Sequence, residues 1–229
     1  MPLPSLTRAI QLIMKSPLIE NTVAFVRQQL EGAEGGHDWF HIERVWKNAL
    51  HIAQTETCAL TVVQLGALLH DIADSKFHNG NESVGPKMAR DFLQNQNISQ
   101  DVIAHVVNII ENISYKGGNF QKNFSSKELN IVQDADRLDA LGAIGIARTF
   151  NYGGFKNRTL YDPEILPVLN MSKDEYKNSQ SPTLNHFYEK LLLLKDKMNT
   201  ETGKKIALQR HEFMEDFLSQ FYAEWNGIQ

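Results

Sequence analysis

The chain has 229 residues, a length typical of one large domain, and its hydrophobic fraction of 42% suits a protein with a sizeable core. A formal net charge of −4 argues against nonspecific nucleic-acid binding, which usually needs a basic face. The single cysteine, Cys58, excludes an internal disulfide. No apolar run has the length of a membrane span, and the first residues do not resemble a signal peptide. We therefore expect a cytoplasmic protein without nucleic-acid or membrane partners.

The spacing of apolar residues predicts helix after helix along the chain. Amphipathic helices are expected near residues 5–15, 18–30, 37–54, 82–94 and 100–112, with a buried, nearly all-apolar helix at 61–72. A further helix opens near Ser126 and runs through Asp136, and Gly142 and Gly145 then either bend it or allow close packing. After a long irregular stretch at 151–182, helices at 183–198 and 203–225 close the chain.

With no convincing strand alternation, the fold class is all-α. We expect an N-terminal helical extension at 1–17 and a single helical domain at 18–229. Within that domain, we expect a core at about 37–150, which carries the candidate metal-binding residues described below, and additional C-terminal helices at 183–226. The leucine-rich C-terminal helices also suggest a homodimer.

The most informative residues are His70 and Asp71, which end the apolar run that starts at Leu65. Burying an imidazole beside a carboxylate without a partner would cost several kcal/mol, so the pair points to a bound ion. Asp74 follows on the same face of the predicted helix.

Two other segments carry polar groups of the same kind. His37, His41 and Arg44 share a face of their predicted helix, because they are spaced by four and three residues. Later, the segment 133–139 places three aspartates in an otherwise hydrophobic helix.

Two imidazoles and two carboxylates are a donor set that suits a divalent first-row metal. Mixed nitrogen and oxygen ligation suits Mn²⁺, Fe²⁺, Co²⁺, Ni²⁺ or Zn²⁺, whereas imidazole ligands disfavour Mg²⁺. Of the possible ions, Mg²⁺ included, Mn²⁺ is our first candidate, and we expect open coordination positions for water and a phosphate oxygen. The competing interpretation is a buried hydrogen-bonded network that holds no metal.

In order along the chain, these residues form the pattern H…HD…D, which resembles the signature of the HD superfamily of metal-dependent phosphohydrolases. The segments 37–45, 68–72, 132–140 and 145–150, together with Lys190-Leu191-Leu192, are similar to its small bacterial YpgQ-like branch. This resemblance extends from about Leu18 to the C-terminus. It implies that the metal ligands are His41, His70, Asp71 and Asp136. Asp136 is preferred to Asp134 because it belongs to the block Ala-Asp-Arg-Leu.

The same resemblance implies a substrate and a reaction. (Deoxy)nucleoside triphosphates would be hydrolysed to the monophosphate and pyrophosphate by a metal-activated water. Asp74 or His37 would accept a proton or orient that water. Basic side chains would offset the charge of the departing pyrophosphate, and the candidates are Arg44, Lys76, Lys116, Lys122, Arg137 and Arg148.

Each of these assignments has a structural alternative. His37 can be a surface residue, Asp74 can cap a helix, and Arg148 can pair with a core carboxylate. Asp134 and Asp139 are expected to make structural contacts, for example with Arg137. The alternative functions are a 5′-nucleotidase, a guanosine tetraphosphate hydrolase, or a metal- and nucleotide-binding regulatory module without turnover.

Overall fold

The computed structural model describes residues 16–32, 38–73, 81–113, 124–169, 171 and 179–228. Every regular element in these ranges is a helix, so the all-α prediction is confirmed. The helices are α2 (Pro17–Gln29), α3 (Trp39–Ala53), α4 (Leu60–Leu69), α5 (Val84–Gln94), α6 (Gln100–Asn112), α7 (Lys127–Asp139), α8 (Gly142–Phe155), α10 (Asn185–Glu189), the 3-10 helix η2 (Leu191–Lys197) and α11 (Glu201–Trp225).

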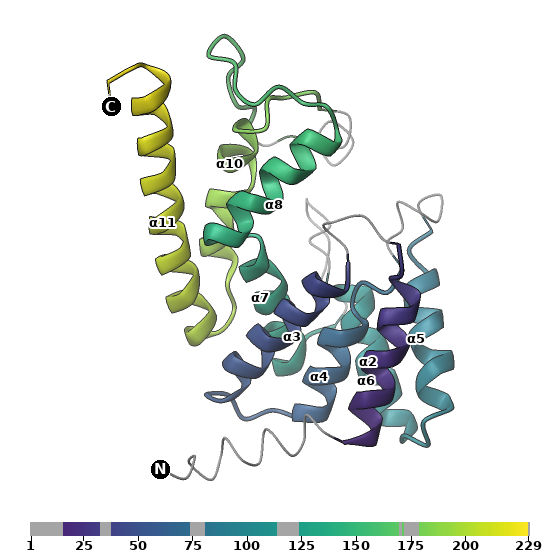
Figure 1. Ribbon diagram of the computed structural model, residues 1–229. Helices are drawn as coiled ribbons and strands as arrows, with labels where there is room; N and C mark the ends of the chain where they lie inside the picture. The colour runs from purple at the N-terminus through teal and green to yellow at the C-terminus, as the bar shows by residue number, and fades with distance from the viewer. Residues whose placement is uncertain are drawn as a thin grey trace, which may run out of the picture.

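Helix α4 is the centre of the first group of helices (Figure 1). It is apolar on all sides, and its residues from Val62 to Leu69 are all buried. Helices α2, α3, α6 and α7 pack against it, and α5 completes the bundle by packing against α6. A helix without a polar face needs such complete cover, which explains why the most hydrophobic segment occupies the middle.

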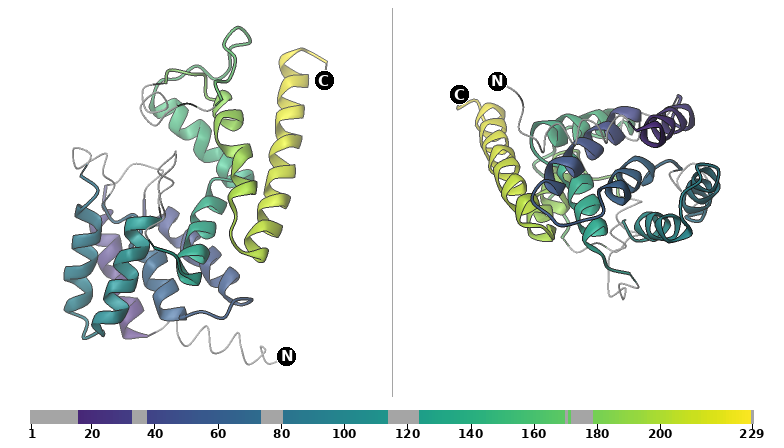
Figure 2. Two further views of the ribbon diagram at one scale, coloured as in Figure 1. Left: turned by 180° about the vertical axis from the view of Figure 1, so that it is seen from behind. Right: turned by 90° about the horizontal axis from the view of Figure 1, so that it is seen from below.

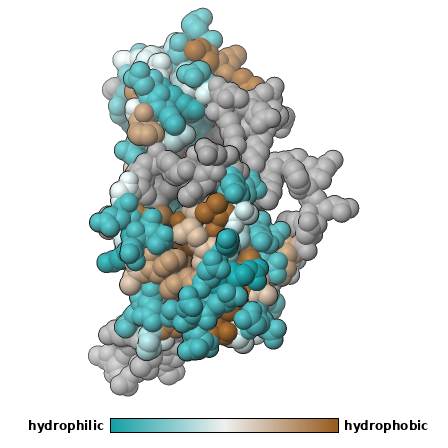
Figure 3. Space-filling model, turned by 90° about the vertical axis from the view of Figure 1, so that its right-hand side faces the viewer, coloured by the Kyte–Doolittle hydropathy of each residue, from teal (hydrophilic) through white to brown (hydrophobic). Residues whose placement is uncertain are grey.

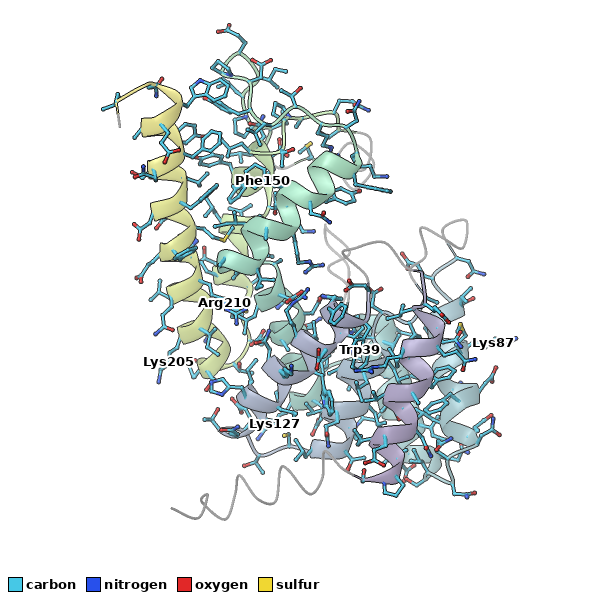
Figure 4. The ribbon with its side chains drawn as sticks, in the orientation of Figure 1. Trp39, Lys87, Lys127, Phe150, Lys205 and Arg210 are labelled. Carbon is cyan, nitrogen blue, oxygen red and sulfur yellow. The ribbon has the colours of Figure 1, made fainter. Side chains whose placement is uncertain are left out.

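Helices α8, α10, η2 and α11 form a second group beside the bundle, and the views of Figures 1 and 2 agree on this arrangement. Phe150 of α8 (Figure 4), Phe187 of α10 and Phe217 of α11 have ring centroids 5.9–6.0 Å apart. Helix α11 also contacts α7, so the C-terminal helices are anchored directly to the segment that carries the late aspartates.

The turn between α7 and α8 uses both glycines that the sequence singled out. Gly142 has a φ of +70°, a left-handed conformation that suits glycine, at the point where the chain turns into α8. A Cβ on Gly145 would lie 2.3 Å from the carbonyl oxygen of Ala140, so only glycine allows this close approach. The first glycine therefore makes the bend and the second makes the close packing.

Three predicted segments differ from the structure. The predicted helix at 183–198 is wrong as a single α-helix, because Lys190 (φ −144°, ψ −55°) leaves the helical region between α10 and η2. The aromatic contacts of α10 with α8 and α11 outweigh the helix propensity of the leucines here. The first residues of the stretch 151–182 belong to α8, which ends at Phe155. The buried helix ends at Leu69, so His70 and Asp71 lie just beyond it.

Hydrophobic residues gather in the middle of the face shown in Figure 3, with hydrophilic residues beside and below them. The rings of Phe25 in α2 and Phe92 in α5 stack with their centroids 4.2 Å apart. None of the helices in the described ranges combines the length and apolar character needed to cross a membrane. The predicted helix at 5–15 lies outside the described residues, and the division of the chain at residue 17 stays a prediction.

Candidate metal centre

Helix α3 places His41 in its first turn. The side chain of Asp38 caps the helix by accepting a hydrogen bond of 3.0 Å from the backbone N–H of His41. This cap fixes where the helix begins, and the apolar face of α3 then carries the imidazole inward. His41 is 2% exposed, and Arg44 follows it one turn later.

His70 is the C-cap of α4, where the buried helix reaches the site. Its Nδ1 lies 2.9 Å from the carbonyl oxygen of Ala67. A carbonyl only accepts, so Nδ1 carries the proton and Nε2 of the neutral ring has a bare lone pair. That Nε2 is buried and has no hydrogen-bond partner in the described part of the chain. A buried lone pair without a partner is costly unless an ion or a water binds it.

Helix α7 brings Asp136 to both imidazoles. Asp136 Oδ1 lies 3.6 Å from Nε2 of His41 and 3.8 Å from Nε2 of His70. Ligand atoms of His41, His70 and Asp71 also lie within 4.8 Å of one another. Two donors bonded to one ion at about 2.1 Å are roughly 3.0–3.5 Å apart when they are adjacent. The two imidazoles are thus close both to Asp71 and to Asp136, at spacings slightly wider than those of ligands that share one ion.

His41 is held in the same tautomer as His70 by a second aspartate of α7. Its Nδ1 lies 2.7 Å from Oδ2 of Asp139, a carboxylate that is almost completely buried. Burial lowers the pKa of His41 below its ordinary value, although the hydrogen bond to Asp139 opposes this. Burial would raise the pKa of Asp139, but the hydrogen bonds from His41 and Arg44 outweigh it and leave that pKa well below its usual range. A neutral imidazole that donates through Nδ1 presents a bare Nε2 to Asp136.

These residues fit a divalent metal ion. Two Nε2 lone pairs and two carboxylates form a mixed nitrogen and oxygen set, which suits first-row metals. A metal-ligating histidine usually donates its other N–H to a carboxylate or a backbone carbonyl. His41 and His70 use one partner of each kind.

Two of the predicted basic residues lie beside this cluster. Asp139 accepts hydrogen bonds from Nε and Nη2 of Arg44, at 2.6 and 3.0 Å, and from Nη1 of Arg148, at 2.7 Å. The arginine side chains are 32% and 25% exposed. Both guanidinium groups are therefore fixed near the candidate metal ligands while part of each faces solvent.

Arg137 is directed elsewhere. Its guanidinium donates to the carbonyl oxygen of Lys197 and lies 3.6 Å from Asp134. The remaining predicted residues lie outside the described residues: His37, Asp74, Lys76, Lys116 and Lys122.

Asp134 has a structural role, as the sequence suggested. Its fully buried carboxylate accepts hydrogen bonds from the backbone and side chains of Asn199 and Thr200. It therefore fastens the N-terminus of α11 to α7. Asp139 was expected to make contacts of this kind with Arg137, but it contacts His41, Arg44 and Arg148 instead.

Sequence reasoning also missed Arg210 of α11, which Figure 4 labels. Its guanidinium donates to the carbonyl oxygen of Leu138 and to Oδ1 of Asn48, at 3.3 Å for the second contact. It thereby places a third positive charge near Asp139. Arg210 is about seventy positions further along the chain, and nothing in its neighbourhood in the sequence signals the contact.

Comparison with known proteins shows which family this chain resembles. Residues 39–141 match the HD domain family. The chain is 35% identical to the Bacillus subtilis protein YpgQ over 91% of this chain and 94% of that protein. The crystal structure of an HD-superfamily hydrolase from Bacillus thuringiensis has a TM-score of 0.73 and 45% identity, and the match covers 91% of this chain and 97% of that chain. The crystal structure of YpgQ in complex with ADP has a TM-score of 0.70 and 32% identity, with 90% and 100% coverage.

Proposed function

Because this chain belongs to the HD domain superfamily, we propose that it is a metal-dependent phosphohydrolase that converts (deoxy)nucleoside triphosphates to the monophosphate and pyrophosphate. The observation that carries the proposal is the buried Nε2 of His70, which lacks a hydrogen-bond partner in the described ranges and lies near the imidazole of His41 and the carboxylate of Asp136. The ADP bound by the relative YpgQ supports a nucleotide as the ligand class.

His41, His70, Asp71 and Asp136 would hold the ion in this proposal. Mn²⁺ is the first candidate, and Mg²⁺, Fe²⁺, Co²⁺, Ni²⁺ and Zn²⁺ are the alternatives. A bound divalent ion would supply Lewis-acid chemistry, lowering the pKa of a water and offsetting phosphate charge.

The arginines supply the electrostatic part of the chemistry. Arg44 and Arg148 place two guanidinium groups beside the ligands, and Asp139 neutralises only one of these two charges. The excess positive charge favours a polyphosphate and stabilises the negative charge that grows on the departing pyrophosphate. Arg137 is not assigned such a contact, because it faces η2.

In the reaction, the oxygen of a water forms a bond to the α-phosphorus. The bond between this phosphorus and the oxygen that bridges to the β-phosphorus breaks, and pyrophosphate leaves with that oxygen. Asp74 or His37 accepts the proton of the water, and the phosphate contacts proposed from their positions in the sequence are Lys76, Lys116 and Lys122.

The proposal is tested by incubating the purified protein, with and without Mn²⁺, with a panel of ribo- and deoxynucleoside triphosphates. We expect monophosphate and pyrophosphate in equal amounts, dependent on the metal. Release of inorganic phosphate alone would contradict attack at the α-phosphorus. Including nucleoside monophosphates and guanosine tetraphosphate in the panel separates a 5′-nucleotidase or a tetraphosphate hydrolase from the proposed activity. Tight nucleotide binding without turnover under any metal would indicate a regulatory module instead.

A further inference from the structure

Asp139 of α7 binds residues from α3 and α8 at one buried point. Its carboxylate, 2% exposed, accepts from Nδ1 of His41 in α3, from Nε and Nη2 of Arg44 in α3, and from Nη1 of Arg148 in α8. Oδ2 alone accepts from all three of these residues, at 2.7, 3.0 and 2.7 Å. A carboxylate with so many charged or strong donors is fixed in position, and it fixes its donors in turn.

The contact with His41 determines which ring nitrogen can ligate. An ionised carboxylate accepts only, so the His41 proton stays on Nδ1 and Nε2 remains bare on the side of Asp136. Asp139 also makes the ring more basic and restricts its rotation, two effects by which such partners raise metal affinity.

The contact with Arg44 is made along one edge of the guanidinium. Nε and Nη2 both donate to Asp139, and Nη1 makes no hydrogen bond with the described residues. A planar guanidinium held by two bonds along one edge has its remaining nitrogen set in a fixed direction. The carboxylate that orients a metal-ligating imidazole therefore also orients a cation suited to phosphate.

We infer that Asp139 is a positioning residue that couples the two halves of the site, holding His41 for the metal and Arg44 and Arg148 for the polyphosphate. The inference rests on the proposed function for the identity of the polyphosphate. Its effect on the metal is independent of any substrate.

The test compares Asp139→Asn with Asp134→Asn, a matched change of a buried carboxylate on the same helix that has no contact with His41. Mn²⁺ binding is measured by calorimetry without nucleotide, on variants whose circular dichroism shows that they are folded. Asp139→Asn should weaken Mn²⁺ binding about 10- to 100-fold, because the amide has no negative charge and replaces one of the two acceptor oxygens by an NH₂ group that faces the donors of His41, Arg44 or Arg148. Asp134→Asn should bind Mn²⁺ as the wild type does. An affinity for Asp139→Asn within about twofold of the wild type would overturn the inference.

A second measurement needs no variant and covers the case in which Asp139→Asn does not fold. Long-range ¹⁵N–¹H correlation spectra of the metal-free wild type report which nitrogen of His41 carries the proton. We expect a protonated Nδ1 and a bare Nε2, and a proton on Nε2 would overturn the inference. If the wild type binds Mn²⁺ normally but turns over no nucleotide, the proposed function fails while the role of Asp139 toward His41 stands.

Discussion

Asp134 and Asp136 lie two positions apart in α7, and replacing each by alanine should affect a different property of the protein. Asp134 is fully buried and bonded to the start of α11, whereas the side chain of Asp136 is 37% exposed and faces two imidazoles. The first should matter for stability and the second for metal binding, although both belong to the same short run of sequence.

The size of the effect at Asp134 follows from the hydrogen-bond donors that the substitution leaves without an acceptor. Asp134→Ala removes the acceptor for the backbone N–H groups of Asn199 and Thr200, among others. At about 1–3 kcal/mol for each buried donor left unsatisfied, these two alone cost roughly 4 kcal/mol. For a domain of this size, that loss corresponds to a fall of about 8–16 °C in Tm.

Asp136→Ala leaves neither imidazole without a hydrogen-bond acceptor, because the distances from Asp136 to the two rings, 3.6 and 3.8 Å, are too long for hydrogen bonds. The free energy of unfolding should change by less than about 1 kcal/mol. Mn²⁺ affinity should fall at least about 100-fold, equivalent to roughly 2.7 kcal/mol. Urea unfolding of the metal-free variants and calorimetric titration with Mn²⁺ give the two quantities. Loss of the metal by Asp134→Ala at wild-type stability, together with retention of the metal by Asp136→Ala, would contradict both assignments.

Three further outcomes are expected. Mn²⁺ at about 100 times its Kd should stabilise the wild type by roughly 2.7 kcal/mol in thermal scans, and should leave the Tm of His70→Ala unchanged. Gly142→Ala should lower the free energy of unfolding by about 1–3 kcal/mol, because φ is +70° and the new Cβ would lie 3.0 Å from Cγ of Arg210. An unchanged free energy of unfolding in urea would contradict this prediction. Burial, helped by nearby positive charges, lowers the pKa of His186 to about 3, so the unfolded chain binds an extra proton below pH about 6.5. The free energy of unfolding should therefore fall with decreasing pH, by roughly 2 kcal/mol at pH 5, and it should fall less steeply in His186→Gln. An equal pH dependence in His186→Gln, or an altered one in the exposed control His51→Gln, would argue against the assignment.

The sequence was most informative where ionisable side chains interrupt a run of hydrophobic residues. His70 and Asp71 were identifiable because they interrupt an apolar run, and the run itself predicted the buried helix α4. The α-helical class followed from periodicity in the same way. In both cases the signal lies within a dozen neighbouring residues, which is the range over which patterns of this kind are readable.

The contacts that complete the site depend on side chains far apart in the sequence. Asp139 is 98 positions from His41, and choosing it over Asp134 as the partner of the imidazole requires the relative rotation of α3 and α7. Arg210 reaches Leu138 only because α11 folds back along α7. The break at Lys190 likewise reflects packing of aromatic rings from three helices, which overrides the local preference of a leucine-rich run for a continuous helix.

In the proposed function, His41, His70, Asp71 and Asp136 would hold one divalent metal ion that serves hydrolysis at the α-phosphorus. The most direct measurement is turnover of a deoxynucleoside triphosphate by the Mn²⁺-loaded protein in H₂¹⁸O, with mass spectrometry of both products. We expect one ¹⁸O atom in the monophosphate, none in the pyrophosphate, and no product from His70→Ala. Label in pyrophosphate or inorganic phosphate, or undiminished turnover by His70→Ala, would contradict it.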